Sequence, residues 1–387
     1  KKGSVAPYLI SSFATLPFFA GYGGLMGKLI RATMYCKSRR DRMEKKRLKS
    51  LAIVGAGGWG SALAACYGEV FAEVSIWAYS KEVADEINTY HTNESYLPGI
   101  TFPVNVRATN SFDFLKTHDL VLLMVPAQHM RSVVRELRPY LKEGAVLVHG
   151  AKGIEKGTLK RISEVVIEET ENKHPVMVLS GPTHAEEVAK KMPTACVLAS
   201  PDEELAKKVQ EMLMLPTFRI YTSSDVVGVE IGGSLKNVIA IATGIADGIG
   251  YGDNARAALI TRGLAEMARL GIKLGANPLT FAGLSGMGDL IATCTSDLSR
   301  NRRAGIELAR GTPVSAITGS QKMVVEGAHT VSGAYKLGQE VGVELPIVEE
   351  VLAVIEGRKA PQEIAPILMQ REAQDELNYL EESSLNL

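Results

Sequence analysis

Cysteine is scarce in this chain, and its four cysteines stand far apart, at Cys36, Cys66, Cys196 and Cys294. No CxxC pair or other metal-ligand spacing occurs, so we expect no metal site, and we expect reduced thiols in a cytosol-like compartment. Net charge is absent as well, because 43 basic residues balance 43 acidic ones. This balance gives no reason to expect nucleic acid or an acidic membrane surface as a partner. A small-molecule substrate is the better expectation for a chain of 387 residues, of which 46% are hydrophobic.

Acidic residues are rare in residues 1–49, where only Asp41 and Glu44 accompany many lysines and arginines. The apolar stretch 5–26 is broken by prolines, glycines and serines, so we expect no membrane-spanning helix there. We predict that this basic leader lies outside the fold. A cytoplasmic location is expected, with two alternatives for the leader: it is a transit segment for a plastid or another organelle, or the enzyme begins near Met43.

The most informative stretch present is residues 51–60, in which a short apolar strand leads into GxGxxG at Gly55, Gly57 and Gly60. Gly55 permits the sharp turn, Gly57 has no Cβ to keep a pyrophosphate away from the backbone, and Gly60 lets the following helix lie close to the strand. The helix N-terminus then offers free N–H groups to the phosphates. With both flanks correct, the motif predicts a dinucleotide site rather than a glycine-rich turn that binds nothing.

Short apolar runs alternate with amphipathic stretches over residues 50–223, which predicts an α/β fold with a Rossmann-like doubly wound parallel sheet. The expected strands are 51–54, 74–78, 120–125, 146–149, 176–179, 195–198 and 218–221. Residues 224–370 are expected to form an all-helical substrate domain, and residues 371–387 a loose acidic tail. The expected helices are 226–248, 254–274, 298–310, 324–341 and 347–355. No repeat or low-complexity linker separates the two domains, so we expect the active cleft between them.

A lysine interrupts an otherwise apolar, small-residue helix at Lys236. Gly232 and Gly233 precede it on the same helix face and are expected to leave room for a ligand beside the ammonium. A lysine in a partly dry cleft has a lowered pKa and can act as general acid or base. The alternative is a glycine pair that packs helices together and a lysine that reaches solvent.

Three further positions carry polar groups suited to an anionic substrate. Lys152 stands among small residues after the expected strand 146–149, at the carboxyl end where ligands of such sheets lie. Asp289 falls in what we expect to be a short loop, from which it could orient Lys236. Arg300 and Asn301 offer donors suited to a phosphate, although a basic run of this kind is more often an exposed helix face.

These residues resemble the signature set of the NAD(P)-dependent sn-glycerol-3-phosphate dehydrogenases, most closely the bacterial-type enzymes and their plastid relatives. The resemblance covers about residues 50–370 in the family's order and spacing. The motifs that carry it are 55–60, 151–153, 180–183, 229–230, 234–238, 254–258, 283–289, 299–301 and 325–327.

The resemblance implies interconversion of dihydroxyacetone phosphate and sn-glycerol 3-phosphate by hydride transfer with NAD(P)H, which supplies glycerol 3-phosphate for glycerophospholipid synthesis. It implies a homodimer. Lys236 would be the catalytic acid/base and a substrate contact, and Asp289 would be catalytic and contact the substrate phosphate or polyol. Lys152 would be catalytic and contact both substrate and nicotinamide. The remaining implied substrate contacts are Gly181, Thr183, Thr293, Ser299, Arg300 and Asn301. The remaining implied cofactor contacts are Gly58, Trp59, Tyr79, Ala185, Arg300, Val324 and Glu326, beside the three motif glycines.

One feature departs from a strict NAD site. The second expected strand is followed by Tyr79, Ser80 and Lys81, without the acid that would bind the adenosine ribose of NAD. Tyr79 falls where many bacterial members carry arginine. We therefore expect NADP or dual use of both cofactors.

Two other functions compete with this interpretation. One is a 3-hydroxyacid or hydroxyacyl-CoA dehydrogenase, which would use different active-site groups. The other is a non-catalytic dinucleotide sensor, which the presence of Lys236 and Asp289 disfavours.

Overall fold

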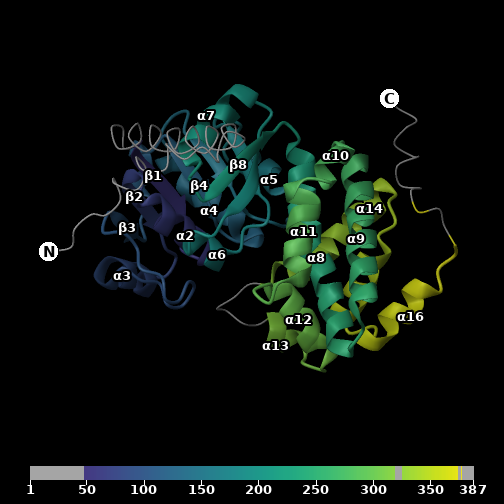
Figure 1. Cartoon of the computed structure of the whole chain (residues 1–387). Coiled ribbons are helices and arrows are strands. Elements are labelled where there is room, and N and C mark those ends of the chain that lie inside the picture. Colours follow the sequence, from purple (N-terminus) through teal and green to yellow (C-terminus); the bar gives the residue numbers. More distant parts are fainter. Residues whose placement is uncertain (1–47, 319–324, 374–375, 377–387) are drawn as a thin grey trace, which may run out of the picture. The chain divides into compact units, whose positions relative to one another are not determined.

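The computed structural model describes residues 48–318, 325–373 and 376. The predictions for residues 1–47 of the basic leader and for most of the acidic tail therefore lie outside the described residues, whereas Leu48 and Lys49, expected outside the fold, belong to a strand. Eight strands form one sheet in the order β3-β2-β1-β4-β5-β6-β7-β8 (Figure 1). They are β1 (Leu48–Val54), β2 (Phe71–Trp77), β3 (Val106–Thr109), β4 (Leu120–Leu123), β5 (Val146–His149), β6 (Val176–Ser180), β7 (Thr194–Ala199) and β8 (Phe218–Ser223).

The predicted α/β fold with a doubly wound sheet is confirmed, with two differences. The pairings β1–β4, β4–β5, β5–β6 and β7–β8 are parallel, but β6 and β7 run antiparallel. An apolar run looks the same in either direction, so the sequence pattern carries no signal for this reversal. Strand β3 was not predicted, because it is short and half of its residues are not buried.

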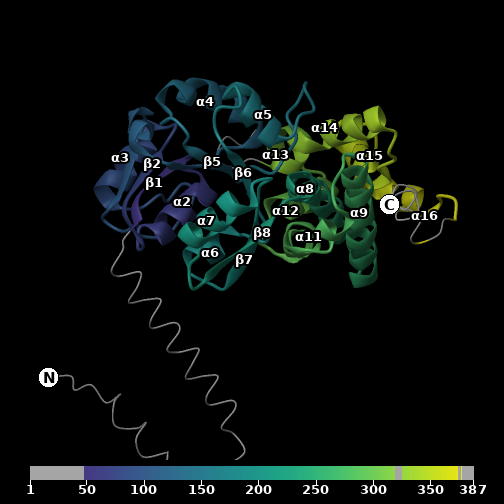
Figure 2. The same cartoon turned by 90° about the horizontal axis from the view of Figure 1, so that it is seen from above.

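Burial explains the central strands. Residues 51–54 of β1 and 121–123 of β4 have no exposed surface, as expected for strands covered by helices on both faces. Figures 1 and 2 show helices flanking this sheet. They are α2 (Gly58–Tyr67), α3 (Lys81–Tyr90), α4 (Met130–Leu137), α5 (Ile162–Glu169), α6 (Ala185–Ala189) and α7 (Glu203–Leu213), with short 3-10 turns η2 (Asp113–Thr117), η3 (Ala127–His129) and η4 (Arg138–Tyr140).

After β8 the described chain is helical, as predicted. The elements are α8 (Val226–Ile249), α9 (Asp253–Lys273), α10 (Pro278–Phe281), a π-helical turn η5 (Leu284–Gly288), α11 (Asp289–Thr295), α12 (Arg300–Ala309), α13 (Val314–Thr318), α14 (Glu326–Val341), α15 (Pro346–Ile355), the 3-10 turn η6 (Pro361–Glu363) and α16 (Ile364–Met369). Elements α10, η5, α11, α13 and α16 were not predicted. They are short, so their apolar residues show too few helical turns to reveal a period.

Helix α8 is the centre of the helical region. Its N-cap is Asp225, whose side chain accepts the backbone N–H of Gly228, and every residue from Gly228 to Ala246 is buried. Helices α9, α11, α12 and α14 pack around it. Among the described helices it is the one long and apolar enough to cross a membrane, but most of it lies inside the protein. Its apolar composition is therefore that of a core helix.

Candidate active site

A buried carboxylate joins the two lysines singled out in the sequence. Lys236 Nζ, on α8, donates to Asp289 Oδ1 at 2.7 Å. Lys152 Nζ, three residues after β5, donates to Asp289 Oδ2 at 2.7 Å. The predicted pairing of Asp289 with Lys236 is confirmed, and the sequence had not indicated that Lys152 shares the same carboxylate. Sheet region and helical region thus meet at this group.

Each lysine has further acceptors. Lys236 Nζ also donates to Thr293 Oγ1 at 2.7 Å, and that hydroxyl donates to the backbone oxygen of Asp289 at 2.6 Å. Lys152 Nζ donates to the backbone oxygen of Gly181 at 2.8 Å and lies 3.5 Å from Thr183 Oγ1. Five of the predicted site residues therefore converge around Asp289.

Burial controls the ionisation of this cluster. Lys236 is 6% exposed and Asp289 1% exposed. Burial lowers the pKa of Lys236 to about 8, the neighbouring Lys152 lowers it as well, and Asp289 opposes both effects. Burial alone would raise the pKa of Asp289, but the two lysines hold it below its ordinary value. Asp289 is therefore a carboxylate at neutral pH, beside an ammonium that can release its proton.

Two expectations about this region are wrong. Asp289 does not lie in a loop: the preceding residues form the π-helical turn η5, and Asp289 begins α11. Gly232 and Gly233 do not leave room for a ligand. A Cβ on Gly232 would lie 2.7 Å from the backbone oxygen of Ser285, and one on Gly233 2.7 Å from Ser180 Oγ. The glycine pair instead brings α8 close to η5 and to the end of β6.

The predicted phosphate group lies at the start of α12. Ser299 caps this helix, since its Oγ accepts the backbone N–H of Arg302 at 3.2 Å. Arg300 is exposed and forms no ion pair with any described residue. Arg302, by contrast, pairs with Asp247 at 2.7 Å. Arg302 therefore has a structural role, whereas Arg300 is available to bind an anion.

Asn301 differs from the expectation of an open phosphate donor. Its Nδ2 donates to Asn237 Oδ1 at 2.9 Å, and its Oδ1 accepts the backbone N–H of Gly327 at 2.9 Å. Asn237 in turn donates to the backbone oxygen of Lys152 at 3.3 Å. Sequence reasoning assigned no role to Asn237. Its position next to Lys236 on a buried helix was the available signal.

The GxGxxG loop has the backbone geometry that its glycines predict. Gly55 has φ +114°, and a Cβ there would lie 2.7 Å from the backbone oxygen of Met124. A Cβ on Gly60 would overlap the backbone oxygen of Gly55, so strand and helix are in close contact. A Cβ on Gly57 would meet nothing within 4 Å. Gly57 is the N-cap of α2 and supplies no side-chain cap, so open space faces the exposed N–H groups of this helix.

The other predicted cofactor residues surround this loop or lie near Lys152. Trp59 and Ala185 pack against one small apolar cluster, and a Cβ on Gly58 would lie 3.8 Å from that of Ala185. Tyr79 follows β2 and is 90% exposed. Glu326 begins α14, and its Oε1 accepts the backbone N–H of Ala127 at 3.4 Å.

Burial also governs Glu326, raising the pKa of its carboxyl to about 7. Its Oε2 has no hydrogen-bond partner among the described residues. The prediction for Val324 falls on a residue outside the described part of the chain.

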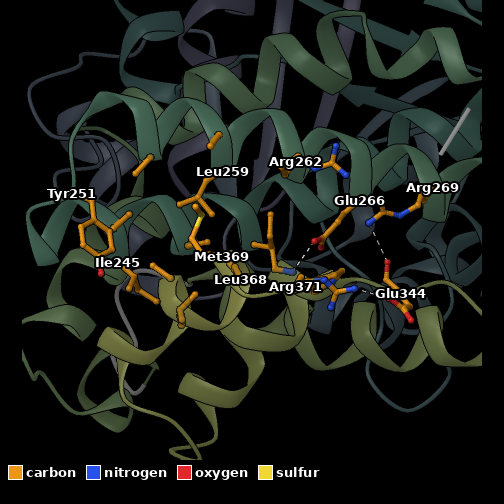
Figure 3. A pocket seen from close by; sticks show the side chains of 18 of the residues that line it. Ile245, Tyr251, Leu259, Arg262, Glu266, Arg269, Glu344, Leu368, Met369 and Arg371 are labelled. Atoms are coloured by element: carbon orange, nitrogen blue, oxygen red, sulfur yellow. Dashed lines mark hydrogen bonds and ion pairs between the residues drawn. The ribbon is translucent and has the colours of Figure 1, made fainter. Parts of the chain in front are cut away.

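A cavity of about 1250 Å³ lies elsewhere, between α8, α9 and the segment around α16. Figure 3 shows its apolar side chains, among them Tyr251 and Met369, and a charged group around Glu266 and Arg371. None of the predicted site residues lines it. In the described part of the chain, no three His, Cys, Asp or Glu side chains are grouped in a way that could hold a metal ion.

Comparison with known proteins agrees with the geometry. Residues 50–206 match the model described as NAD-dependent glycerol-3-phosphate dehydrogenase N-terminus, and residues 225–366 match the corresponding C-terminus model. A glycerol-3-phosphate dehydrogenase [NAD(P)+] of Geobacillus kaustophilus is 48% identical over 338 residues, which cover 86% of this chain and 98% of that protein. This chain belongs to the NAD-dependent glycerol-3-phosphate dehydrogenase family.

Other members of the glycerol-3-phosphate dehydrogenase family agree with this assignment. The enzyme of Desulfitobacterium hafniense is 44% identical, over 85% of this chain and 94% of its own length. The crystal structure of the Coxiella burnetii enzyme superposes with a TM-score of 0.80 at 36% identity and covers 84% of this chain and 100% of its own. The predicted fold, family and NAD(P)-dependent activity on dihydroxyacetone phosphate and glycerol 3-phosphate are confirmed. The matches favour neither of the two alternative functions.

Proposed function

We propose that Lys236 is the proton donor and acceptor of this dehydrogenase and that Asp289 holds it in place. The observation that carries the proposal is the pair of 2.7 Å contacts from Lys236 and Lys152 to the two oxygens of one buried carboxylate. Carbonyl reduction needs a proton at the oxygen where negative charge develops. Of the two ammonium groups on this carboxylate, Lys236 can donate the proton and Lys152 can stabilise the negative charge.

The lowered pKa of Lys236 suits both directions of the reaction. At neutral pH a lysine with a pKa of about 8 is mainly protonated, so it can protonate the developing alkoxide of glycerol 3-phosphate. Above that pH the neutral amine can remove the hydroxyl proton when glycerol 3-phosphate is oxidised. An unperturbed lysine near 10.5 would release its proton much less readily.

Lys152 is proposed to stabilise the carbonyl oxygen and to touch the nicotinamide end of the cofactor. Its ammonium is held from the sheet side by the Gly181 oxygen. Thr183 Oγ1 lies 3.5 Å from the same ammonium. Gly181 and Thr183 thereby form the turn against which the substrate would lie.

The substrate phosphate is proposed to bind at the start of α12, through Arg300, Ser299 and the backbone N–H groups of the helix. The absence of an ion pair for Arg300 within the described residues supports this role, since a guanidinium fork suits a phosphate. Asn301 contributes mainly by holding the start of α12 to α8 and α14, as its two internal hydrogen bonds indicate. A phosphate anchored away from the reacting carbon lets binding energy position the carbonyl.

The open Gly57 and the start of α2 fit a dinucleotide pyrophosphate. Gly55, Gly58, Trp59, Gly60 and Ala185 would hold this part of the cofactor. When bound, the cofactor supplies or accepts the hydride. Residues Val324 and Glu326 are proposed contacts on its far side.

Cofactor choice is proposed to favour NADP or dual use. Tyr79 is exposed beyond β2, and no acid occupies the strand-end position that binds the adenosine ribose of NAD. Lys81 could donate to a 2′-phosphate, but the Ser80 hydroxyl, which the sequence also offered for this role, already donates to the Glu82 carboxylate.

The remaining proposals concern the whole chain rather than the site. They are a homodimer, a cytoplasmic or plastid location, a supply of glycerol 3-phosphate for phospholipid synthesis, and the division into a dinucleotide domain 50–223 and a substrate domain 224–370. The change from strand to helix after β8 supports the division.

Steady-state rates of dihydroxyacetone phosphate reduction with NADPH and NADH test the proposal, with 3-hydroxyacids as alternative substrates in the oxidative direction. We expect turnover of the phosphorylated substrate, and a kcat/KM with NADPH at least equal to that with NADH. Turnover of 3-hydroxyacids without turnover of glycerol 3-phosphate would contradict the substrate assignment.

A further inference from the structure

A second buried carboxylate lies on the helix that carries Lys236. Glu230 is 5% exposed, and one of its oxygens accepts the backbone N–H of Ser163 at 2.7 Å. The other oxygen accepts from Ser163 Oγ at 2.6 Å and from Arg161 Nη1 at 2.7 Å. His149, which has no exposed surface, approaches Glu230 to 3.3 Å. None of these residues belongs to the predicted substrate or cofactor contacts.

The three elements joined by Glu230 are those that place the two lysines. Glu230 lies on α8, six residues before Lys236, or about 9 Å along the helix. His149 ends β5 and stands three residues before Lys152. Arg161 is the N-cap of α5, the helix that follows Lys152 in the chain (Figure 2). Glu230 is therefore hydrogen-bonded to the residues that follow the segment containing Lys152, and it lies against the residue that precedes that segment.

The chemistry of the contacts makes this attachment specific. Burial by itself would raise the pKa of Glu230, but His149 and Arg161 hold it below its ordinary value, so the group is a carboxylate. Ser163 and Arg161 present donors to it, whereas His149 lies close to it without a hydrogen bond. A neutral amide of the same shape would turn an NH₂ group toward donors, which leaves buried polar groups unpaired.

We propose that Glu230 is a positioning residue for the reaction: it sets the height and rotation of α8 against β5 and α5, so that Lys236 and Lys152 reach the same carboxylate of Asp289. This inference rests on the proposed roles of the two lysines. Both amines must lie at 2.7 Å from Asp289, and a displacement of about 1 Å at a reacting group costs on the order of 100-fold in rate. A buried charge cluster at the helix contact supplies that precision.

The test is the Glu230→Gln variant of the full chain, compared with Glu169→Gln. Glu169 is a matched control, because it is a similarly buried carboxylate that accepts from Arg131 at 2.7 Å and from Arg135 at 2.9 Å. Its side-chain partners lie on α4, and its side chain makes no hydrogen bond to a described residue of α8. Both variants remove one buried charge from α5 or its surroundings, so both should lower the midpoint of thermal unfolding.

Only Glu230→Gln should change the catalytic parameters. We expect kcat for dihydroxyacetone phosphate reduction to fall about 10- to 100-fold, with the KM for NADPH within about twofold of wild type. The basic limb of its pH profile should move upward from about 8, since a loosened α8 admits water to Lys236. A loss no larger than that of Glu169→Gln, with an unchanged pH profile, would overturn the inference.

Ser163→Ala keeps the proposal testable if Glu230→Gln does not fold. It removes one donor from the same carboxylate and leaves Arg161 in place, so we expect a kcat about threefold lower and a shift of the basic limb in the same direction. Unchanged values would again overturn the inference. A Lys236→Ala enzyme measured in parallel tells a failure of the proposed function from a failure of the positioning role. If Lys236→Ala keeps its turnover, the proposed function itself is wrong. If Lys236→Ala is inactive and Glu230→Gln has normal kinetics, only the positioning role of Glu230 is wrong.

Discussion

Thr293 Oγ1 lies 2.7 Å from Lys236 Nζ and accepts a hydrogen bond from it, while the threonine hydroxyl donates to the backbone oxygen of Asp289 at 2.6 Å. The threonine is on α11, one turn after Asp289. The Lys236 ammonium is therefore held by two acceptors from one helix, which fixes its direction as well as its distance.

Thr293→Val should lower kcat about 10-fold or more, because valine keeps the shape but removes an acceptor from a buried charged group, a loss of about 1.5–3 kcal/mol. Steady-state kinetics of dihydroxyacetone phosphate reduction provide the measurement. Thr293→Ser is the control, since it restores the hydroxyl and should recover most of the rate. Equal rates for the valine and serine variants would remove Thr293 from the mechanism.

The pH dependence of the two directions should be opposite. Lys236, with its pKa lowered to about 8 by burial, is the proton donor in reduction, so kcat/KM for reduction should fall about tenfold per pH unit above pH 8. In oxidation the neutral amine is needed, so the rate should rise with pH and level off above 8. Initial rates between pH 7 and about 9.5 at saturating cofactor measure both. A reduction rate that stays constant over this range would argue against Lys236 as the acid.

Gly57→Ala and Gly60→Ala should separate cofactor binding from folding. The Gly57 methyl would enter open space, so the protein should keep its thermal midpoint while dinucleotide affinity falls about 10-fold, or 1.4 kcal/mol. The Gly60 methyl would overlap the Gly55 backbone, so stability should fall by about 1–3 kcal/mol. Thermal unfolding and fluorescence titration with NADPH test both. Normal cofactor binding in Gly57→Ala would refute the assigned contact.

Glu266 should make the stability of the protein depend on pH. It is 2% exposed, and burial raises the pKa of its carboxyl from 4.5 to about 7, although it accepts the backbone N–H of Ile347. The folded state keeps this proton to higher pH than the unfolded state. The stabilisation is therefore complete below pH 4.5 and is lost as pH rises to about 7, a change of about 3 kcal/mol.

Glu266→Gln should remove this dependence. Urea unfolding at pH 4.5 and pH 7.5 should show a free energy of unfolding that falls by about 3 kcal/mol more in wild type than in the variant. Glu344→Gln, whose exposed side chain lines the same cavity, should behave like wild type. Parallel pH dependences in wild type and Glu266→Gln would show that Glu266 ionises normally.

The parts of this protein that could be predicted from sequence are those set by local pattern. Gly55, Gly57 and Gly60 follow a strand and precede a helix within a few residues, and the turn they form depends on little else. Lys236 was identified because a charge is unexpected on a helix of apolar and small residues. Both features can be recognised from a single helix or strand and the residues next to it in the sequence.

The parts that could not be predicted depend on contacts between distant segments. The sequence could not show that Lys152 and Lys236 share Asp289, because 137 residues separate Lys152 from that carboxylate. The internal hydrogen bonds of Asn301 are likewise made to Asn237, 64 positions away in the chain, and to the start of α14. Asn301 stands beside Arg300 and therefore resembled a phosphate ligand in the sequence, although its amide is hydrogen-bonded within the protein.

The most direct test of the central claim compares Lys236→Ala with Lys236→Arg. Arginine keeps the positive charge but does not release its proton near neutral pH, so a purely electrostatic role would be restored by it and a proton-transfer role would not. We predict that both variants lose at least about 100-fold in kcat for dihydroxyacetone phosphate reduction, while the Kd for NADPH stays within about twofold of wild type. Recovery of more than about a tenth of the wild-type kcat by Lys236→Arg would contradict the account.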